Sequence, residues 1–233
     1  MDFYGQCALC KVGTRICRSP EGQHPAFCST TLYPEALAKA AAEYAKPEIG
    51  EFAYQASVQE AASYIDRDAQ PPYLYPVKPR IQEIIEFSRR MGYQKLGMAF
   101  CGGLHQEAAI VAKILQDHGF EVVSAMCKVG GVDKGAIGIQ ACDKIKIGQY
   151  EAMCNPIAQA EVLNAAATEF NILMGLCVGH DSLFLKYSQA MTTVFAVKDR
   201  VLGHNPMAAI YNYNSYYQRF QQDRIKEVTV KND

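Results

Sequence analysis

The stretch FNILMGLCVGHDSLFLKYSQAM, residues 170–191, decides the fold class of this chain. Its short apolar run from Ile172 to Leu176 is typical of a parallel strand that is covered on both faces. An amphipathic helical pattern follows at once, and Asp181 is placed to cap the N-terminus of that helix. The pattern predicts that Cys177 and His180 lie in the loop between strand and helix, which is where open α/β sheets bind ligands.

The same alternation of strand and helix extends from Tyr93 to the end of the chain. Apolar runs predict strands at residues 95–100, 121–126, 172–176 and 193–197, and helical patterns lie at 104–118, at 156–168 and from Pro206 onward. Asn155 and Asn205 each precede a proline and are predicted N-caps. We therefore expect an α/β protein with a Rossmann-like, doubly wound parallel sheet of about four or more strands. Neither GxGxxG nor GxxxxGK[ST] occurs, so nucleotide binding has little support.

Two further segments precede this domain, which gives three predicted parts: a cysteine-rich metal-binding segment at 1–32, a helical segment at 33–92 and the Rossmann-like domain at 93–233. Helices are predicted at 34–45, 49–68 and 81–91, and QPPYLYPVKP at 70–79 is the clearest linker. We expect the helical segment to clasp the sheet domain or to form the face of a homodimer.

Composition narrows the classes of function. The chain has 233 residues, 49% of them hydrophobic, and a formal net charge of −1, so it lacks the basic surface that nucleic-acid binding needs. No apolar stretch is long enough to cross a membrane and the first residues do not resemble a signal peptide, so we expect a cytoplasmic protein. The nine cysteines then indicate metal ligands or reactive thiols rather than disulfides.

The first segment concentrates cysteines among Gly, Pro, Arg and Ser residues. Cys7 and Cys10 form a CxxC knuckle, and Cys17 and Cys28 complete a set of four thiols that suits zinc or an iron–sulfur cluster. His24 is an alternative ligand. The spacing does not choose between the metals, and the competing interpretation is a flexible tail with chance cysteines.

Four other cysteines share a place in the predicted sheet. Cys101, Cys127 and Cys177 follow strands, and Cys154 precedes a helix. Because parallel strands end at one edge, these thiols are predicted to converge as the first shell of a [4Fe-4S] cluster or a zinc ion. The alternative is that each is a small buried hydrophobe. Cys142 has polar neighbours and is treated as incidental.

Polar residues flank the same edge. His180, Asp181 and Lys198 are candidates for acid–base or anchoring roles, and His204 also faces the predicted crevice. Together they would suit a small anionic or sulfur-containing substrate. Polar loops are common, however, so each of these residues could equally be solvated.

Several motifs resemble a known family. CALC followed by two more cysteines, then GMAFCGGL, CKVGGVDK, MCNPIAQAE, GLCVGHDSLF and VKDRVLGHNP, is similar to a family of uncharacterised prokaryotic proteins, mostly from anaerobes and archaea. Its members are described as a domain of unknown function with four N-terminal cysteines proposed to bind zinc. The resemblance implies a metal-binding protein, matches Cys7, Cys10, Cys17 and Cys28 to the proposed ligands, and does not decide between zinc and iron.

Three functional hypotheses remain open, and the sequence does not decide whether the protein is an enzyme. The first is an iron–sulfur enzyme, such as a desulfurase or dehydratase, with a cluster at the sheet edge. The second is an electron-transfer or redox-sensing module that docks a redox partner protein. The third is a zinc-stabilised binding domain in which the cysteines at the sheet edge belong to the core.

Overall fold

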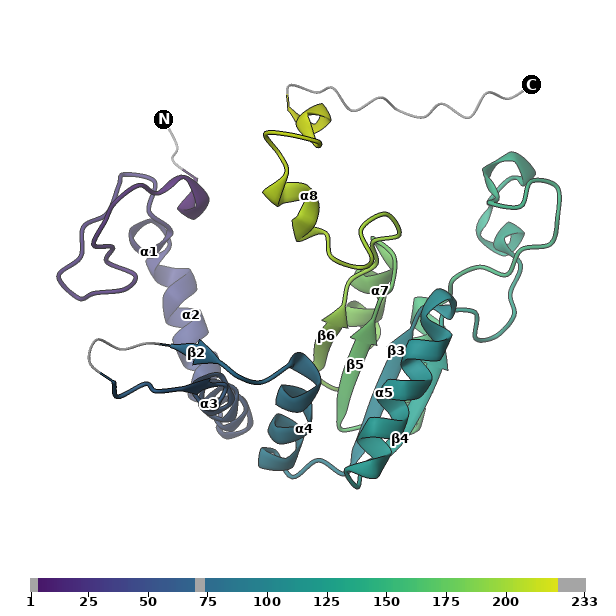
Figure 1. The fold of residues 1–233 in the computed structure, drawn as a ribbon, viewed down its shortest axis with the longest axis horizontal. Coiled ribbons are helices and arrows are strands. Elements are labelled where there is room, and N and C mark those ends of the chain that lie inside the picture. The colour runs from purple at the N-terminus through teal and green to yellow at the C-terminus, as the bar shows by residue number, and fades with distance from the viewer. Residues whose placement is uncertain (1–3, 70–73, 222–233) are drawn as a thin grey trace. The chain divides into compact units, whose positions relative to one another are not determined.

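The computed structural model of the chain describes residues 4–69 and 74–221 (Figure 1). The chain divides into two compact units, Met1–Tyr75 and Pro76–Asp233. Residues 70–73 of the predicted linker lie outside the described residues. The helix at Arg80–Arg90, which the sequence pattern grouped with the helical segment, belongs to the second unit.

The first unit consists of a cysteine-rich loop and two longer helices. Its elements are a 3₁₀ turn at Cys7–Leu9, α1 (Ser29–Leu32), α2 (Pro34–Tyr44), α3 (Pro47–Ala62) and β1 (Tyr64–Ile65), which pairs with β2 (Tyr75–Pro76). The helix predicted over 49–68 ends earlier because the chain after Ala62 enters this two-stranded ladder. Among the described residues of the unit only Gln59 and Ser63 are buried, so it has no apolar core of its own.

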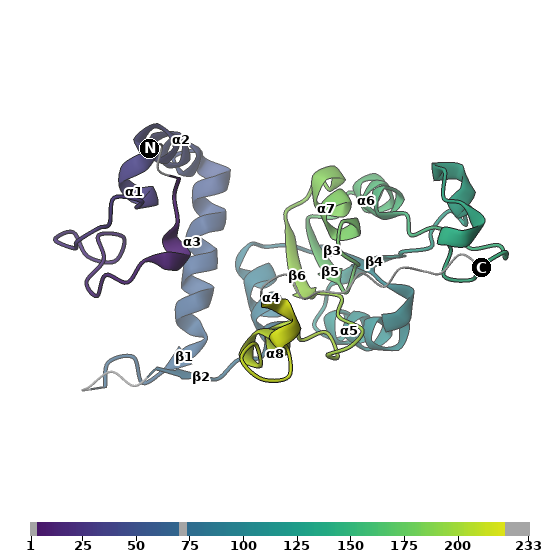
Figure 2. The same ribbon diagram turned by 90° about the horizontal axis from the view of Figure 1, so that it is seen from above.

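The second unit is a parallel sheet between two layers of helices. In chain order it contains α4 (Arg80–Arg90), β3 (Lys95–Phe100), α5 (His105–Asp117), β4 (Glu121–Met126), α6 (Pro156–Ala165), β5 (Phe170–Met174), α7 (His180–Tyr187), β6 (Thr192–Ala196) and α8 (Met207–Tyr211). The strands are parallel in the order β4-β3-β5-β6. Helices α6 and α7 cover one face, and α4 and α5 cover the other (Figure 2). The prediction of a Rossmann-like α/β fold is confirmed.

This strand order creates a switch point at the centre of the sheet. The chain goes from β3 outward to β4 on one side and then returns to β5 on the other side of β3. Crossover connections therefore leave β3 and β5 in opposite directions, and in open α/β sheets this is the arrangement in which ligands bind beyond the strand carboxyl ends. Cys101 follows β3 directly, and its N–H donates to the carbonyl of Met174 at the end of β5 (3.1 Å).

The central strands are buried throughout. All five residues of β5 are buried, and Leu96, Met98 and Ala99 of β3 are almost fully covered. Asn171 is the polar exception, and its amide is satisfied inside the core: Oδ1 accepts from Thr168 Oγ1 (2.8 Å) and Nδ2 donates to Ser188 Oγ (2.9 Å). A buried amide is tolerated only when it is hydrogen-bonded in this way.

Two predicted helix caps are wrong and one is confirmed. Asn155 caps α6, because its Oδ1 accepts from the N–H of Ala158 (3.1 Å). Asp181 does not cap α7: Gly179, at φ 83°, is the N-cap, so the helix begins at His180 and Asp181 lies in its first turn. Asn205 does not cap the last helix, since α8 starts only at Met207, after Pro206.

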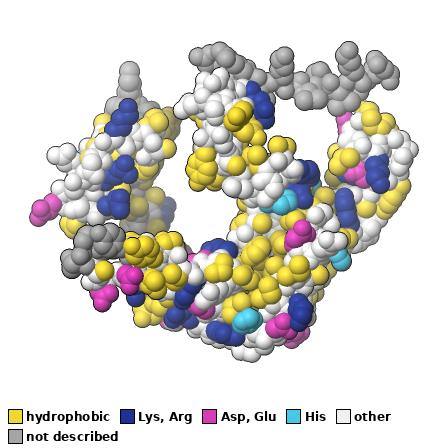
Figure 3. Space-filling model, in the orientation of Figure 1, with side chains coloured by type: hydrophobic (Ala, Val, Ile, Leu, Met, Phe, Trp, Pro, Cys, Tyr) yellow, Lys and Arg dark blue, Asp and Glu magenta, His cyan; other side chains and the backbone are white. Residues whose placement is uncertain are grey.

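A hollow of about 390 Å³ lies on the α4–α5 side of the sheet. Leu104, Ile110, Met174, Phe195 and His204 are among its mainly apolar lining residues. Apolar side chains gather over this part of the second unit in the space-filling view (Figure 3). Among the described residues, none of the helices combines the length and the apolar character needed to cross a membrane.

Candidate thiol sites

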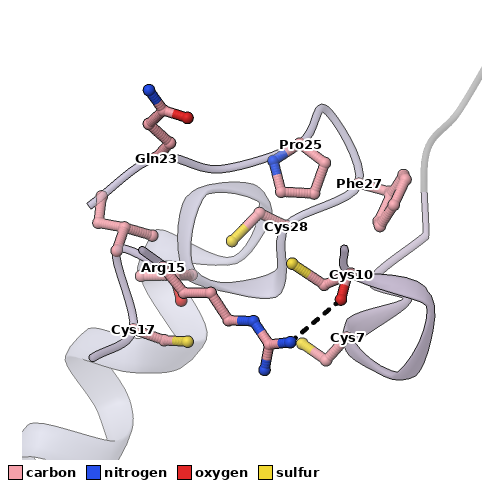
Figure 4. A pocket seen from close by; sticks show the side chains of 10 residues that line it. Cys7, Cys10, Arg15, Cys17, Gln23, Pro25, Phe27 and Cys28 are labelled. Carbon is pink, nitrogen blue, oxygen red and sulfur yellow. Dashed lines mark hydrogen bonds between the residues drawn. The ribbon is translucent and has the colours of Figure 1, made fainter. Parts of the chain in front are cut away.

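The four cysteines of the first unit line one small cavity. Cys7, Cys10, Cys17 and Cys28 surround a space of about 80 Å³, to which Arg15 and Phe27 also contribute. Figure 4 shows the four sulfur atoms turned toward the interior of this loop. The loop is held by backbone bonds, among them Gln23 N–H to the carbonyl of Thr14 (2.8 Å) and Gln6 N–H to that of Phe27 (3.2 Å).

Arg15 is the residue of this cavity that the sequence pattern did not single out. Its Nη2 donates to the carbonyl of Cys10 (3.2 Å) and its Nε donates to that of Val12 (3.1 Å), so the guanidinium lies among the thiols. At Cys28 burial raises the thiol pKa, but hydrogen bonds from Thr30 and Thr31 at the start of α1 outweigh it and lower the pKa overall. The hydrogen bonds at the start of α1 therefore favour the thiolate of Cys28.

Three cysteines of the second unit gather at the carboxyl edge of the sheet. Cys127, at the end of β4, is buried, and Cys101 and Cys154 pack against the same buried cluster. The N–H of Gly102 donates to Cys127 Sγ (3.3 Å), and the N–H of Asn155 donates to the Cys127 carbonyl (2.7 Å). Backbone hydrogen bonds therefore hold the turn after β3 and the segment before α6 beside Cys127 at the end of β4.

The thiols of Cys127 and Cys154 interact directly and titrate in opposite directions. The hydrogen bond from Cys127 lowers the pKa of Cys154 against the effect of its burial, and the positive charges of Lys128 and His180 lower it further. The same hydrogen bond and burial raise the pKa of Cys127. In this interaction the buried Cys127 is the donor and the more exposed Cys154 is the acceptor.

Two of the predicted acid–base residues lie close to these sulfur atoms. A Cβ on Gly103 would lie 3.2 Å from Lys198 Nζ and 3.9 Å from Cys101 Sγ, so the ammonium group covers the turn after β3. His180 is near enough for its charge to act on Cys154. Its Nδ1 is buried, and no hydrogen-bond partner for it exists among the residues that the structure describes.

The other predicted residues have different partners. Arg200 Nη2 donates to Cys177 Sγ (2.9 Å), and Asp181 Oδ1 accepts from the N–H of Ser182 (2.8 Å). His204 Nδ1 accepts from the N–H of Asp199 (3.2 Å). Inclusion of Cys177 in the set of ligands, and a proton-transfer role for Asp181, therefore stay predictions.

The sequence pattern also missed Gln159, which is fully buried in α6. Its Nε2 donates to the carbonyls of Phe100 (3.1 Å) and Ala125 (2.7 Å), so it joins the ends of β3 and β4, one residue before Cys101 and two before Cys127. The signal was available, because a glutamine on the core face of an apolar helix needs buried hydrogen-bond partners.

The donor chemistry of both sites suits a soft metal. Thiolates bind zinc and iron–sulfur clusters, and the N–H group that donates to Cys127 is a feature that stabilises bound thiolates. As they stand, however, no three His, Cys, Asp or Glu side chains in residues 4–69 and 74–221 are arranged to hold a metal ion. Metal binding therefore requires the side chains to draw together, as is common when binding and folding are coupled.

The sequence of the chain is similar to a protein family and to an individual archaeal protein. The profile of a family described as protein of unknown function DUF1847 matches residues 28–195. The chain belongs to the DUF1847 family. The uncharacterized protein MJ0455 of Methanocaldococcus jannaschii is 52% identical over 160 residues, which are 69% of this chain and 77% of that protein.

The DUF1847 match includes one thiol site entirely and the other in part. Cys101, Cys127, Cys154 and Cys177 all fall inside residues 28–195, whereas of the N-terminal set only Cys28 does. Lys198 lies just beyond the matched region. The resemblance to an uncharacterised prokaryotic family is confirmed, and neither description names an activity or a ligand.

Proposed function

We propose that this chain is a cytoplasmic metal-binding protein whose crevice, formed by Cys101, Cys127 and Cys154, holds an iron–sulfur cluster, with zinc as the alternative. The observation that carries this proposal is the gathering of three thiols from separate segments at the carboxyl ends of β3 and β4 in a parallel sheet. When bound, a [4Fe-4S] cluster with three protein ligands supplies one open iron as a Lewis acid.

The surrounding side chains suit a small anionic or sulfur-containing substrate. Lys198 presents its ammonium group beside Cys101, and Lys128 contributes positive charge beside Cys154. Both would attract an anion into the crevice. The buried, unpartnered Nδ1 of His180 can hold or move a proton at that atom, which fits a group bound next to the thiols.

The N-terminal cavity supports a second metal of structural character. Four thiols line one space there, so every coordination position of a tetrahedral metal would be filled by the protein. A closed site of this kind stabilises the fold of a segment and does not take substrate.

Metal analysis on anoxically purified full-length protein tests both assignments. We expect iron and visible cluster absorption in the unmodified chain, loss of both in Cys154→Ser, and retention in Cys142→Ser, whose cysteine is exposed. Cys28→Ser should remove only the N-terminal metal. Iron content that is the same in Cys154→Ser and Cys142→Ser would refute the crevice assignment.

The Cys177→Ser variant distinguishes the hypothesis of an enzyme-like centre from that of an electron-transfer module. If Cys177 is a fourth ligand, the variant loses cluster stability and the cluster in the unmodified chain is fully ligated, as electron transfer to a redox partner protein requires. If it is not, the variant retains its iron, and cyanide should perturb the cluster spectrum through the open position.

A further inference from the structure

The hollow on the α4–α5 side of the sheet is separate from the thiol crevice. Successive residues of a strand face opposite sides of a sheet. Leu173 of β5 therefore belongs to the buried cluster that contains Cys127, whereas Met174 lines the hollow. Phe195 and Ala196 of β6 extend this apolar lining. The hollow measures about 390 Å³, which falls within the range of small-molecule pockets.

The hollow has only two polar side chains in its lining, Glu107 of α5 and His204 of the loop before α8. His204 has φ 67°, a left-handed conformation that costs free energy for a residue other than glycine. Asp199 holds it there: the Asp199 carbonyl accepts from the N–H of His204 (2.9 Å), and the N–H of Asp199 donates to His204 Nδ1 (3.2 Å). The imidazole is therefore fixed at the edge of the hollow.

The same contacts determine which ring nitrogen of His204 carries a proton. Because Nδ1 accepts a hydrogen bond, the proton of the neutral ring is on Nε2. No hydrogen-bond partner for Nε2 exists within residues 4–69 and 74–221. Asp199 is itself held, since its Oδ1 accepts from the N–H groups of Val201 (3.0 Å) and Leu202 (2.8 Å). His204 thus offers one oriented N–H donor beside an apolar space.

We propose that the hollow binds a small, largely apolar molecule with one neutral oxygen acceptor, such as a ketone, which accepts from Nε2–H of His204. A concave apolar space with a single oriented donor is the arrangement of small-molecule pockets. The negative charge of Glu107 in the same lining disfavours a carboxylate as the acceptor. This goes beyond the proposed function, because it uses the other face of the sheet and requires no metal.

Titration of the full-length protein with three matched probes, followed by methyl NMR, tests the proposal. We expect 2-acetylnaphthalene, which has a ketone, to shift the methyl signals of Ile110 and Ile114 in the hollow. It should bind about three- to tenfold more tightly than naphthalene, which lacks the acceptor. The anion 2-naphthoate should bind more weakly than the ketone, and Glu107→Gln should reduce that difference.

Two variants separate the hydrogen-bond donor from the space. Asparagine tolerates positive φ, and its side chain does not reach the position of Nε2. His204→Asn should therefore abolish the preference for the ketone while both uncharged probes still bind. Ala196→Leu fills the hollow and should weaken the binding of all three probes. His118→Asn, at the exposed end of α5, is the matched control and should behave as the unmodified chain does.

Three results would overturn the proposal. The first is an absence of shifts in the methyl signals of the hollow, and the second is equal affinity for the ketone and naphthalene. The third is a shift of these signals when protein concentration rises without a probe, which would show that a second copy of the chain occupies the hollow. Circular dichroism checks the fold of each variant, and the probe series on the unmodified chain needs no variant. Cys154→Ser should bind the probes normally, so failure here is distinguishable from failure of the proposed metal site.

Discussion

Gly175 shows at the scale of one residue how closely the turns after β3 and β5 approach each other. It has φ 69°, and a Cβ there would lie 2.3 Å from Leu104 Cδ1. The chain therefore leaves β5 with a backbone conformation that favours glycine, while the turn after β3 packs directly against it. Any side chain at this position would push apart the two loops that carry Cys101 and Cys177.

Gly175→Ala should destabilise the protein more than Gly179→Ala does. Both positions have positive φ, but a Cβ on Gly179 would meet nothing within 4 Å. We expect Gly179→Ala to cost about 1 kcal/mol from strain, and Gly175→Ala to cost about 1–3 kcal/mol more from overpacking. Urea unfolding measures both. Combining Gly175→Ala with Leu104→Ala should recover part of the difference, and equal losses for the two single variants would contradict the packing argument.

At the scale of elements, Gln159 joins α6 to the ends of β3 and β4. Gln159→Met keeps the volume and removes both donated hydrogen bonds, so we expect a loss of about 1–3 kcal/mol in the free energy of unfolding. Because these hydrogen bonds lie at the carboxyl ends of β3 and β4, amide exchange should also rise at both strand ends. Gln82→Met is the control, since the Gln82 side chain donates to Glu86 Oε1 (2.8 Å) on the exposed side of α4.

Two carboxylates help to hold the long loop between β4 and α6 in its conformation. The N–H of Gly135, together with Lys144, holds the pKa of Asp133 below its ordinary value, and Lys134 does the same for Glu151. A carboxylate whose pKa is lowered in the folded state stabilises that state at any pH above its ordinary pKa. This stabilisation is lost as the pH falls through the lowered, folded-state pKa.

Residues 128–152 should therefore loosen on acidification before the sheet does. We expect exchange protection in this segment, corrected for intrinsic rates, to fall once the pH drops below the ordinary carboxyl values of 3.8 and 4.5, while β3 and β5 stay protected. Asp133→Asn should show the loosened state already at neutral pH. Loss of protection in all three regions at the same pH would indicate global unfolding instead.

The sequence predicted elements well where the pattern is local. The bounds of β3 and β4 matched the prediction because each is a short, mainly apolar run that begins at a charged residue and is followed by a turn. The cap of α7 was missed because Gly179, rather than Asp181, makes the turn, and a composition pattern does not reveal a backbone angle. Strand direction alone placed Cys101 and Cys127 at one edge of the sheet. The position of Cys154 beside them, and the contacts of Gln159 and Arg200, depend on packing between distant segments.

At the scale of the whole molecule, the two units differ in what stabilises them. The second unit has a continuous apolar core across both faces of its sheet, whereas the described part of the first has no buried apolar side chain. A unit of this size with so little buried apolar surface cannot offset the conformational entropy lost on folding. A bound metal is one of the usual ways in which small units are stabilised. The first unit offers four thiols around one cavity.

Removal of metal should therefore unfold the first unit and leave the second intact. We expect hydrogen exchange in α2 and α3 of the full-length protein to approach the rates of unfolded chain after chelation, while protection of β3 and β5 remains, because the metal would supply the stability that burial does not. Cys28→Ser should reproduce this without a chelator, and Cys142→Ser should not. Full protection of α2 and α3 in protein shown to be metal-free would mean that something other than the N-terminal thiols holds the unit together.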